Sequence, residues 1–125
     1  MDAIEQIRQQ VERARTAGRD SRVAELRRRV EAALQALSDP SVAVYLFGSW
    51  VSGRFDGQSD VDLMVIAPSE AVAENARNRL MDVADDVVAF TETEWRRRQA
   101  RGDPFVRRIA GERLALYGAE GAAHE

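Results

Sequence analysis

The chain has 125 residues, of which 45% are hydrophobic and 31% are charged, and its formal net charge is −3. This length suits one domain with a single hydrophobic core, and the composition is that of a folded globular protein rather than a disordered or fibrous one. The absence of cysteine excludes disulfides, thiolate nucleophiles and cysteine-based metal centres, and the acidic balance argues against direct nucleic-acid binding.

The first 40 residues have helical periodicity. Apolar residues recur every three or four positions over 3–15 and again over 23–37, which predicts two amphipathic helices broken near Gly18. Pro40 ends the second helix, because proline cannot donate its backbone hydrogen bond. We therefore expect residues 1–40 to form a helical extension. This segment has no apolar signal core, and no stretch of the chain reaches the roughly 18 apolar residues of a membrane helix, so we expect a cytoplasmic protein without membrane contact.

Three short apolar segments follow, separated by helical patterns. Residues 42–47, 61–66 and 86–90 are rich in β-branched and aromatic types and are predicted to be strands. Pro68 closes the second strand, and a helix is expected to start near Ser69. Thr91 and Glu94 form a capping box for a further helix through Trp95.

The last predicted helix starts at Asp103 and Pro104, which are suitable as N-cap and first helical residue. Its apolar pattern runs through Leu116 to Gly118, the expected C-cap, and the tail behind it is expected to be disordered. The order of elements predicts an α/β (α+β) fold, with a small mixed β-sheet covered by helices, over residues 41–125.

The available chemistry is narrow, because all eighteen basic residues are arginine and the only histidine, His124, lies beside the C-terminus. Catalysis would depend on carboxylates, hydroxyls, arginine and the backbone. Asp60 and Asp62 stand at the mouth of a predicted strand, and the two-residue period of a strand points both carboxylates to one face, with Cα atoms roughly 6.5 Å apart. Two adjacent carboxylates favour a hard divalent cation such as Mg²⁺ or Mn²⁺; the alternative is a solvated acidic turn.

Gly48 and Ser49 follow directly after the first predicted strand, where a short helix is expected to begin. Free backbone N–H groups at a helix start bind phosphate, and glycine permits close approach. Gly53 permits a tight turn, and Arg54 can reach a phosphate, although Ser49 could be a simple N-cap and Arg54 a solvated residue.

Gly48-Ser49, ten intervening residues and Asp60-Val61-Asp62 resemble the GS-x10-DxD signature of the DNA polymerase β-type nucleotidyltransferases. The flanking strands are similar in particular to those of the minimal nucleotidyltransferases (MNT), and the resemblance covers residues 42–117. It implies metal-dependent transfer of a nucleoside monophosphate from an NTP, with ATP as the expected donor and two Mg²⁺ ions, or Mn²⁺, as cofactors. Trp50 departs from the small, basic or hydroxylated aromatic residue of many relatives.

The resemblance also implies roles for single residues. Asp60, Asp62 and Asp86 would be the catalytic metal ligands. The expected nucleotide-binding residues are Gly48, Ser49, Gly53, Arg54 and Ser59. Asp85 competes with Asp86 for the third position, because adjacent strand residues point to opposite faces. We choose Asp86, since the apolar run begins directly after it.

The acceptor that this resemblance favours is a tyrosine of a partner HEPN ribonuclease toxin, which such antitoxins silence by adenylylation. One alternative is a non-catalytic antitoxin that sequesters the toxin by contact alone. Another is nucleotidyl transfer to a small molecule or to tRNA; small-molecule transferases of the superfamily usually carry an added C-terminal domain, which we do not find in this sequence. A homo-oligomer is compatible with these expectations.

Overall fold

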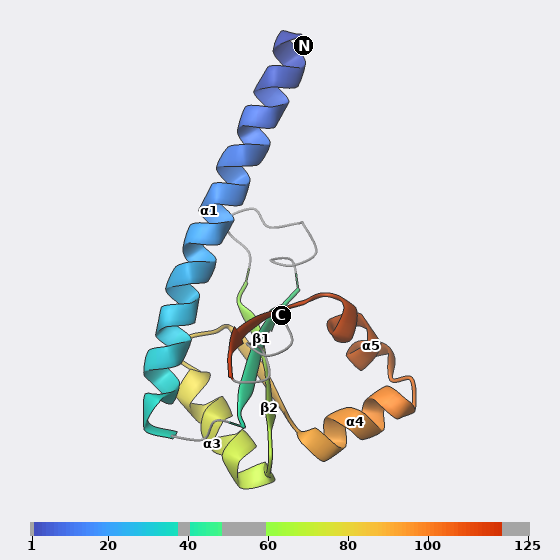
Figure 1. Cartoon of the computed structure of the whole chain (residues 1–125). Helices are drawn as coiled ribbons and strands as arrows, with labels where there is room; N and C mark the ends of the chain where they lie inside the picture. Colours follow the sequence, from blue (N-terminus) through green and yellow to red (C-terminus); the bar gives the residue numbers. More distant parts are fainter. Residues whose placement is uncertain (1, 38–40, 49–59, 119–125) are drawn as a thin grey trace.

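The sheet is built from four strands in the order β3-β2-β1-β4 (Figure 1). The computed structural model describes residues 2–37, 41–48 and 60–118. The strands are β1 (Ala43–Phe47), β2 (Asp62–Ala67), β3 (Asp86–Thr91) and β4 (Arg113–Tyr117). β1 runs antiparallel to both β2 and β4, whereas β2 and β3 are parallel. The predicted mixed sheet is therefore confirmed, with each of the three predicted strands found within one residue of its expected bounds.

Helices cover both faces of the sheet, and side chains alternate between two hydrophobic clusters. Val44 and Leu46 of β1 and Leu63 and Val65 of β2 pack against two helices, α1 (Ala3–Leu34) and α3 (Glu70–Leu80). Their neighbours Ala43, Tyr45, Met64 and Ile66 pack on the other face against α4 (Glu92–Ala100) and α5 (Pro104–Gly111). Because β1 and β2 are buried on both faces, their sequences are apolar runs rather than alternating patterns.

One long helix, α1 (Ala3–Leu34), replaces the two that the sequence predicts, and a 3-10 turn, Gln35–Leu37, follows it. The predicted break near Gly18 is wrong. A glycine inside a helix costs only about 1 kcal/mol relative to alanine, which is too little to end the helix here. The buried contacts of α1 begin five residues later, at Val23. The predicted stop at Pro40 lies outside the described residues, and the boundary at residue 40 stays a prediction.

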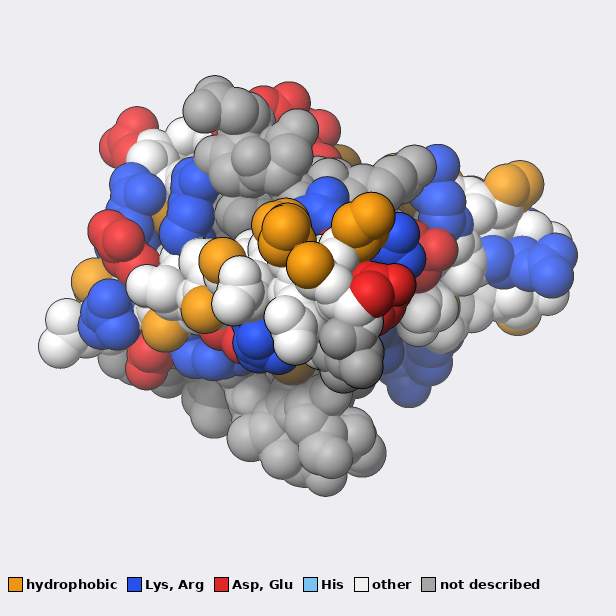
Figure 2. Space-filling model, turned by 90° about the horizontal axis from the view of Figure 1, so that it is seen from above, with side chains coloured by type: hydrophobic (Ala, Val, Ile, Leu, Met, Phe, Trp, Pro, Cys, Tyr) orange, Lys and Arg blue, Asp and Glu red, His pale blue; other side chains and the backbone are white. Residues whose placement is uncertain are grey.

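The first half of α1 projects beyond the sheet (Figure 1). All buried residues of the helix lie at Val23 or later, while Ile4 is 70% exposed and Ile7 and Val11 are each 59% exposed. Viewed from above, the surface of the molecule mixes arginine and carboxylate side chains with exposed hydrophobic ones (Figure 2). Within the described ranges, no helix has the length and apolar character that a membrane span requires.

The shorter helices begin at the predicted caps. α3 (Glu70–Leu80) starts after Ser69, and α4 (Glu92–Ala100) starts after Thr91, whose hydroxyl accepts a 3.0 Å hydrogen bond from the Glu94 N–H. α5 (Pro104–Gly111) is capped by the Asp103 carboxylate, which accepts from the Phe105 N–H at 2.9 Å. Two half-buried polar residues, Thr91 and Asp103, thus fix where α4 and α5 begin on one face of the sheet.

The prediction of a helix that runs on to Gly118 is wrong. α5 ends at Gly111, and residues 113–117 form β4, which pairs with β1 and buries Leu116. This pairing between distant parts of the chain overrides the helical pattern of the apolar residues. Gly118 then has φ +105°, and a Cβ at this position would overlap the Val42 carbonyl oxygen and lie 2.8 Å from Ala43 Cα.

Candidate functional site

Four residues in register form a row across one end of the sheet. Asp86 of β3 pairs with Asp62 of β2, Asp62 with Phe47 of β1, and Phe47 with Arg113 of β4. Directly paired residues share a face, and Met64, two residues after Asp62, packs on the α4 and α5 side. The row therefore lies on that face. It places two carboxylates on neighbouring strands, whose backbones are about 4.8 Å apart in any sheet.

Asp62 is the acid whose pKa is shifted by its surroundings. Burial raises the pKa of Asp62, and the charges of Asp86, Asp60 and Asp85 raise it further, in that order. Its carboxylate forms no hydrogen bond or ion pair within the part of the chain that the structure describes. An ionised carboxylate among other carboxylates gains from a cation, which would remove both the repulsion and the desolvation cost.

Gly48 lies directly against this carboxylate. Its φ is +89°, which favours glycine, and a Cβ here would lie only 3.0 Å from Asp62 Oδ2. The end of β1 and the start of β2 thus meet as the motif spacing predicts. Ser49, Gly53, Arg54 and Ser59 lie outside the described residues, as do Trp50 and the short helix predicted after Ser49.

Asp85 and Asp86 have different surroundings. The Asp85 carboxylate accepts a 2.7 Å hydrogen bond from the Val61 N–H, and the backbone N–H groups of both aspartates donate to the Val61 carbonyl. Asp85 therefore ties β3 to the start of β2. The Asp86 carboxylate has no such partner among the described residues, and it stands beside Asp62 in the row. These contacts support Asp86 as the third acid, an assignment that stays a prediction.

We expect Asp86→Asn to abolish the nucleotide transfer that the sequence resemblance implies and Asp85→Asn to keep most of it. The first change removes a carboxylate beside Asp62, whereas an amide oxygen at position 85 can still accept from the Val61 N–H. Initial rates of transfer from α-labelled ATP measure both variants. The reverse order of activities would show that Asp85, not Asp86, enters the site.

A small cavity of about 160 Å³ opens at Asp62. Its lining is Phe47, Gly48, Asp62, Arg108, Ile109 and Glu112. Sequence reasoning missed Arg108 and Glu112, which lie on α5 and directly after it. Their i, i+4 spacing is a weak signal that they share a face, but nothing local indicates that this face covers the end of β1.

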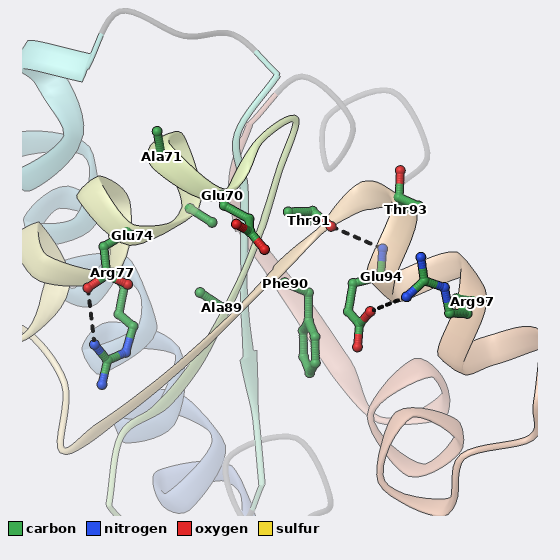
Figure 3. Close-up of a pocket in the computed structure, with 11 residues that line it drawn as sticks. Glu70, Ala71, Glu74, Arg77, Ala89, Phe90, Thr91, Thr93, Glu94 and Arg97 are labelled. Atoms are coloured by element: carbon green, nitrogen blue, oxygen red, sulfur yellow. Dashed lines mark hydrogen bonds and ion pairs between the residues drawn. The ribbon is translucent and has the colours of Figure 1, made fainter.

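A larger cavity, of about 750 Å³, lies between α3, β3 and α4 (Figure 3). It opens near Phe90 and Thr91, at the opposite end of β3 from Asp86, and none of the predicted site residues lines it. Its two arginines are engaged by glutamates: Arg77 lies 4.0 Å from Glu74, and Arg97 lies 3.2 Å from Glu94. We therefore place the candidate site at the smaller cavity, where the Asp62 carboxylate has no hydrogen-bond or ion-pair partner among the described residues.

The donor set of the row suits a hard divalent ion, although the side chains are not assembled around one. Within residues 2–37, 41–48 and 60–118, no three acidic or histidine side chains converge closely enough to hold a metal ion. Asp62 and Asp86 supply carboxylate oxygens from neighbouring strands, and Asp60 precedes Asp62 by two residues. Oxygen donors of this kind are those that Mg²⁺ prefers, and the raised pKa of Asp62 marks the place where positive charge is lacking.

Comparison with known proteins gives a consistent picture. A sequence model of the nucleotidyltransferase domain matches residues 27–116, from within α1 to β4. No curated protein matches the chain. The fold is similar to that of a putative nucleotidyltransferase from Sulfolobus solfataricus, with 19% identity, a TM-score of 0.51 and coverage of 83% of this chain and 87% of that one. A crystal structure of a toxin-antitoxin with AMP-PNP has 17% identity, a TM-score of 0.47 and coverage of 77% and 76%.

Proposed function

This chain belongs to the nucleotidyltransferase domain family, and we propose that it moves AMP from ATP to a hydroxyl group of a protein. The observation that carries this proposal is the meeting of Gly48, Asp62 and Asp86 at one end of the sheet. A glycine backbone that can approach phosphate thus lies beside a carboxylate that requires a cation.

In the proposed reaction, the acceptor oxygen forms a bond to the α-phosphorus of ATP, and the bond from that phosphorus to the bridging oxygen of the β-phosphate breaks. Pyrophosphate leaves. Asp86 takes the proton of the attacking hydroxyl. Gly48 lets the backbone approach the triphosphate, and Ser49, Gly53, Arg54 and Ser59 are proposed to hold it.

Divalent metals are common in nucleotidyltransferases of this family. We propose that Asp60, Asp62 and Asp86 hold two Mg²⁺ ions, or Mn²⁺, which when bound neutralise the charge that develops on the transferred phosphate and its leaving group. The chain itself then has two tasks, which are to orient the α-phosphate toward the acceptor and to accept one proton.

The size of the cavity favours a macromolecular acceptor. Sites that enclose a whole small molecule usually measure about 300–1,000 Å³, whereas the cavity at Asp62 measures about 160 Å³. This cavity thus has room for phosphates but not for a small hydroxylated acceptor as well. A hydroxyl presented on the surface of another protein needs no such enclosure. The resemblance to minimal nucleotidyltransferases favours a tyrosine of a HEPN toxin as this acceptor.

The proposal is tested by incubating the chain with α-labelled ATP, CTP, GTP or UTP and Mg²⁺, with and without the protein encoded by the adjacent gene. We expect label from ATP on a tyrosine of that neighbour, and none when chelator is added. Label on a small molecule or on tRNA would replace the protein acceptor. Binding of the neighbour without transfer in any mixture would instead establish a non-catalytic antitoxin.

A further inference from the structure

Arg108 differs from the other arginines that line the cavities of this chain. It lies on α5, is exposed, and faces the cavity that contains Asp62. Within the described residues its guanidinium forms no hydrogen bond, ion pair or ring contact. Glu112 stands four residues later and lines the same cavity, a spacing that allows an ion pair, yet no pair forms.

On the neighbouring helix α4, two of the three arginines are paired with acids. On α4, Arg98 donates to Glu94 at 2.7 Å and to Asp103 at 3.3 Å, and Arg97 donates to Glu94 at 3.2 Å. Arg108 is therefore available for an anion from outside the chain. A guanidinium recognises phosphate well, because its planar set of donors matches two phosphate oxygens at once.

The cavity combines groups for ligands of opposite charge. Asp62 offers carboxylate oxygens to a cation, while Arg108 and the backbone at Gly48 suit an anion. A phosphate group that carries a divalent cation satisfies both requirements at once. The volume of about 160 Å³ is too small for a whole nucleotide, so the cavity fits only the phosphate part.

The order of strands indicates which phosphates these are. Asp62 pairs with Asp86 on one side and with Phe47 on the other, and the cavity opens on the Phe47 side without including Asp86. In an in-line displacement, the attacking and leaving oxygens lie on opposite sides of the phosphorus. With the attacking hydroxyl at Asp86, Arg108 is on the side of the leaving group.

We propose that Arg108 binds the β- and γ-phosphates of the NTP and then the pyrophosphate that departs. This inference rests on the proposed function, since it assigns the leaving-group side of the same site. Arg108 acts with the backbone at Gly48 in holding the triphosphate and makes no contact with the nucleoside.

The test compares Arg108→Gln with Arg107→Gln in the full chain. Arg107 is the adjacent residue of α5, is equally exposed and does not line the cavity, so its variant carries the same loss of charge. Isothermal titration with Mg²⁺ measures the affinity for α,β-methylene-ATP, inorganic pyrophosphate and AMP. Because both side chains are exposed, both variants are expected to fold, which thermal melts verify.

We expect Arg108→Gln to weaken binding of α,β-methylene-ATP and of pyrophosphate by about tenfold to 100-fold and to leave AMP binding unchanged. Arg107→Gln should match the wild type for all three ligands. Arg108→Lys keeps the charge but loses the paired donors, so its affinities should be intermediate.

Two results would overturn the assignment of Arg108 alone. One is wild-type affinity for pyrophosphate in Arg108→Gln, and the other is an equal loss for AMP, which would indicate a general change of the site. A wild-type chain that binds neither α,β-methylene-ATP nor pyrophosphate would overturn the proposed function together with this inference.

Discussion

Replacement of Asp62 by asparagine is expected to lower the rate of nucleotide transfer by at least about 10³-fold, which corresponds to about 4 kcal/mol of lost transition-state stabilisation. Asparagine has nearly the same shape as aspartate, but its amide cannot neutralise a cation. Asp62 also pairs with Asp86 of β3 and lies against Gly48. Single-turnover transfer from α-labelled ATP measures the loss. Substantial transfer in this variant would refute the metal-ligand role of Asp62.

The stability of the same variant provides the control for misfolding. Burial and the neighbouring acids raise the pKa of Asp62 above its ordinary value of 3.8, so the native state binds this proton more tightly than the unfolded state does. The wild type therefore loses stability relative to Asp62→Asn as the pH rises from about 3.8 through the raised native pKa, and the deficit persists at higher pH.

In chelator at neutral pH, Asp62→Asn should consequently melt at or above the wild-type temperature. With excess Mg²⁺ and a non-hydrolysable NTP the order should reverse, because ligands that bind the native wild-type site add stability by mass action. An inactive variant that melts well below the wild type in chelator would show that its lost activity comes from unfolding.

The second large effect is expected at Gly118, where alanine should lower the free energy of unfolding by at least about 3 kcal/mol. The added Cβ would overlap the Val42 carbonyl oxygen and crowd Ala43 Cα, and both are backbone atoms that no rotamer change can move. The positive φ of +105° adds strain. Relief requires β1 and the end of β4 to separate, which would disturb the core around Val44 and Leu116.

Gly102→Ala is the matched control. Gly102 also has a positive φ, +71°, but a Cβ there would meet nothing within 4 Å. This variant should lose only about 1 kcal/mol, from the left-handed backbone alone. Urea unfolding of the two variants separates crowding from backbone strain. Equal losses would mean that Gly118 does not approach β1 as closely as the structure places it.

Local patterns predicted the parts of the fold that depend on neighbours in the chain. Thr91 and Asp103 are N-caps that form within one helical turn, and both predicted helix starts are confirmed. Only the Thr91 half of the predicted capping box forms, because the Glu94 carboxylate accepts from Arg97 and Arg98. β4 could not be found in this way, because Leu114 and Leu116 also suit a helix. Their strand conformation depends on pairing with β1, which is far away in the sequence.

The candidate site was predictable only in part. The proximity of Gly48 to Asp62 follows from the motif, and the placement of Asp86 beside Asp62 follows from two parallel strands in register. Arg108 carries no such signal. It resembles any arginine of a solvated helix until α5 is seen to cover the end of β1, and only this packing brings it to the cavity.

The projecting half of α1 divides the chain into regions of unequal protection against hydrogen exchange. Residues 3–22 form a helical segment of about 30 Å without a buried side chain, and most of the stability of a helix in a protein comes from the packing of such side chains. We expect their amides to exchange through local fraying, with a small opening free energy, and the amides around Val30 and Leu34 to exchange only when the core opens. Helical circular dichroism should then decline before the sheet unfolds, so that the two signals do not describe one cooperative transition.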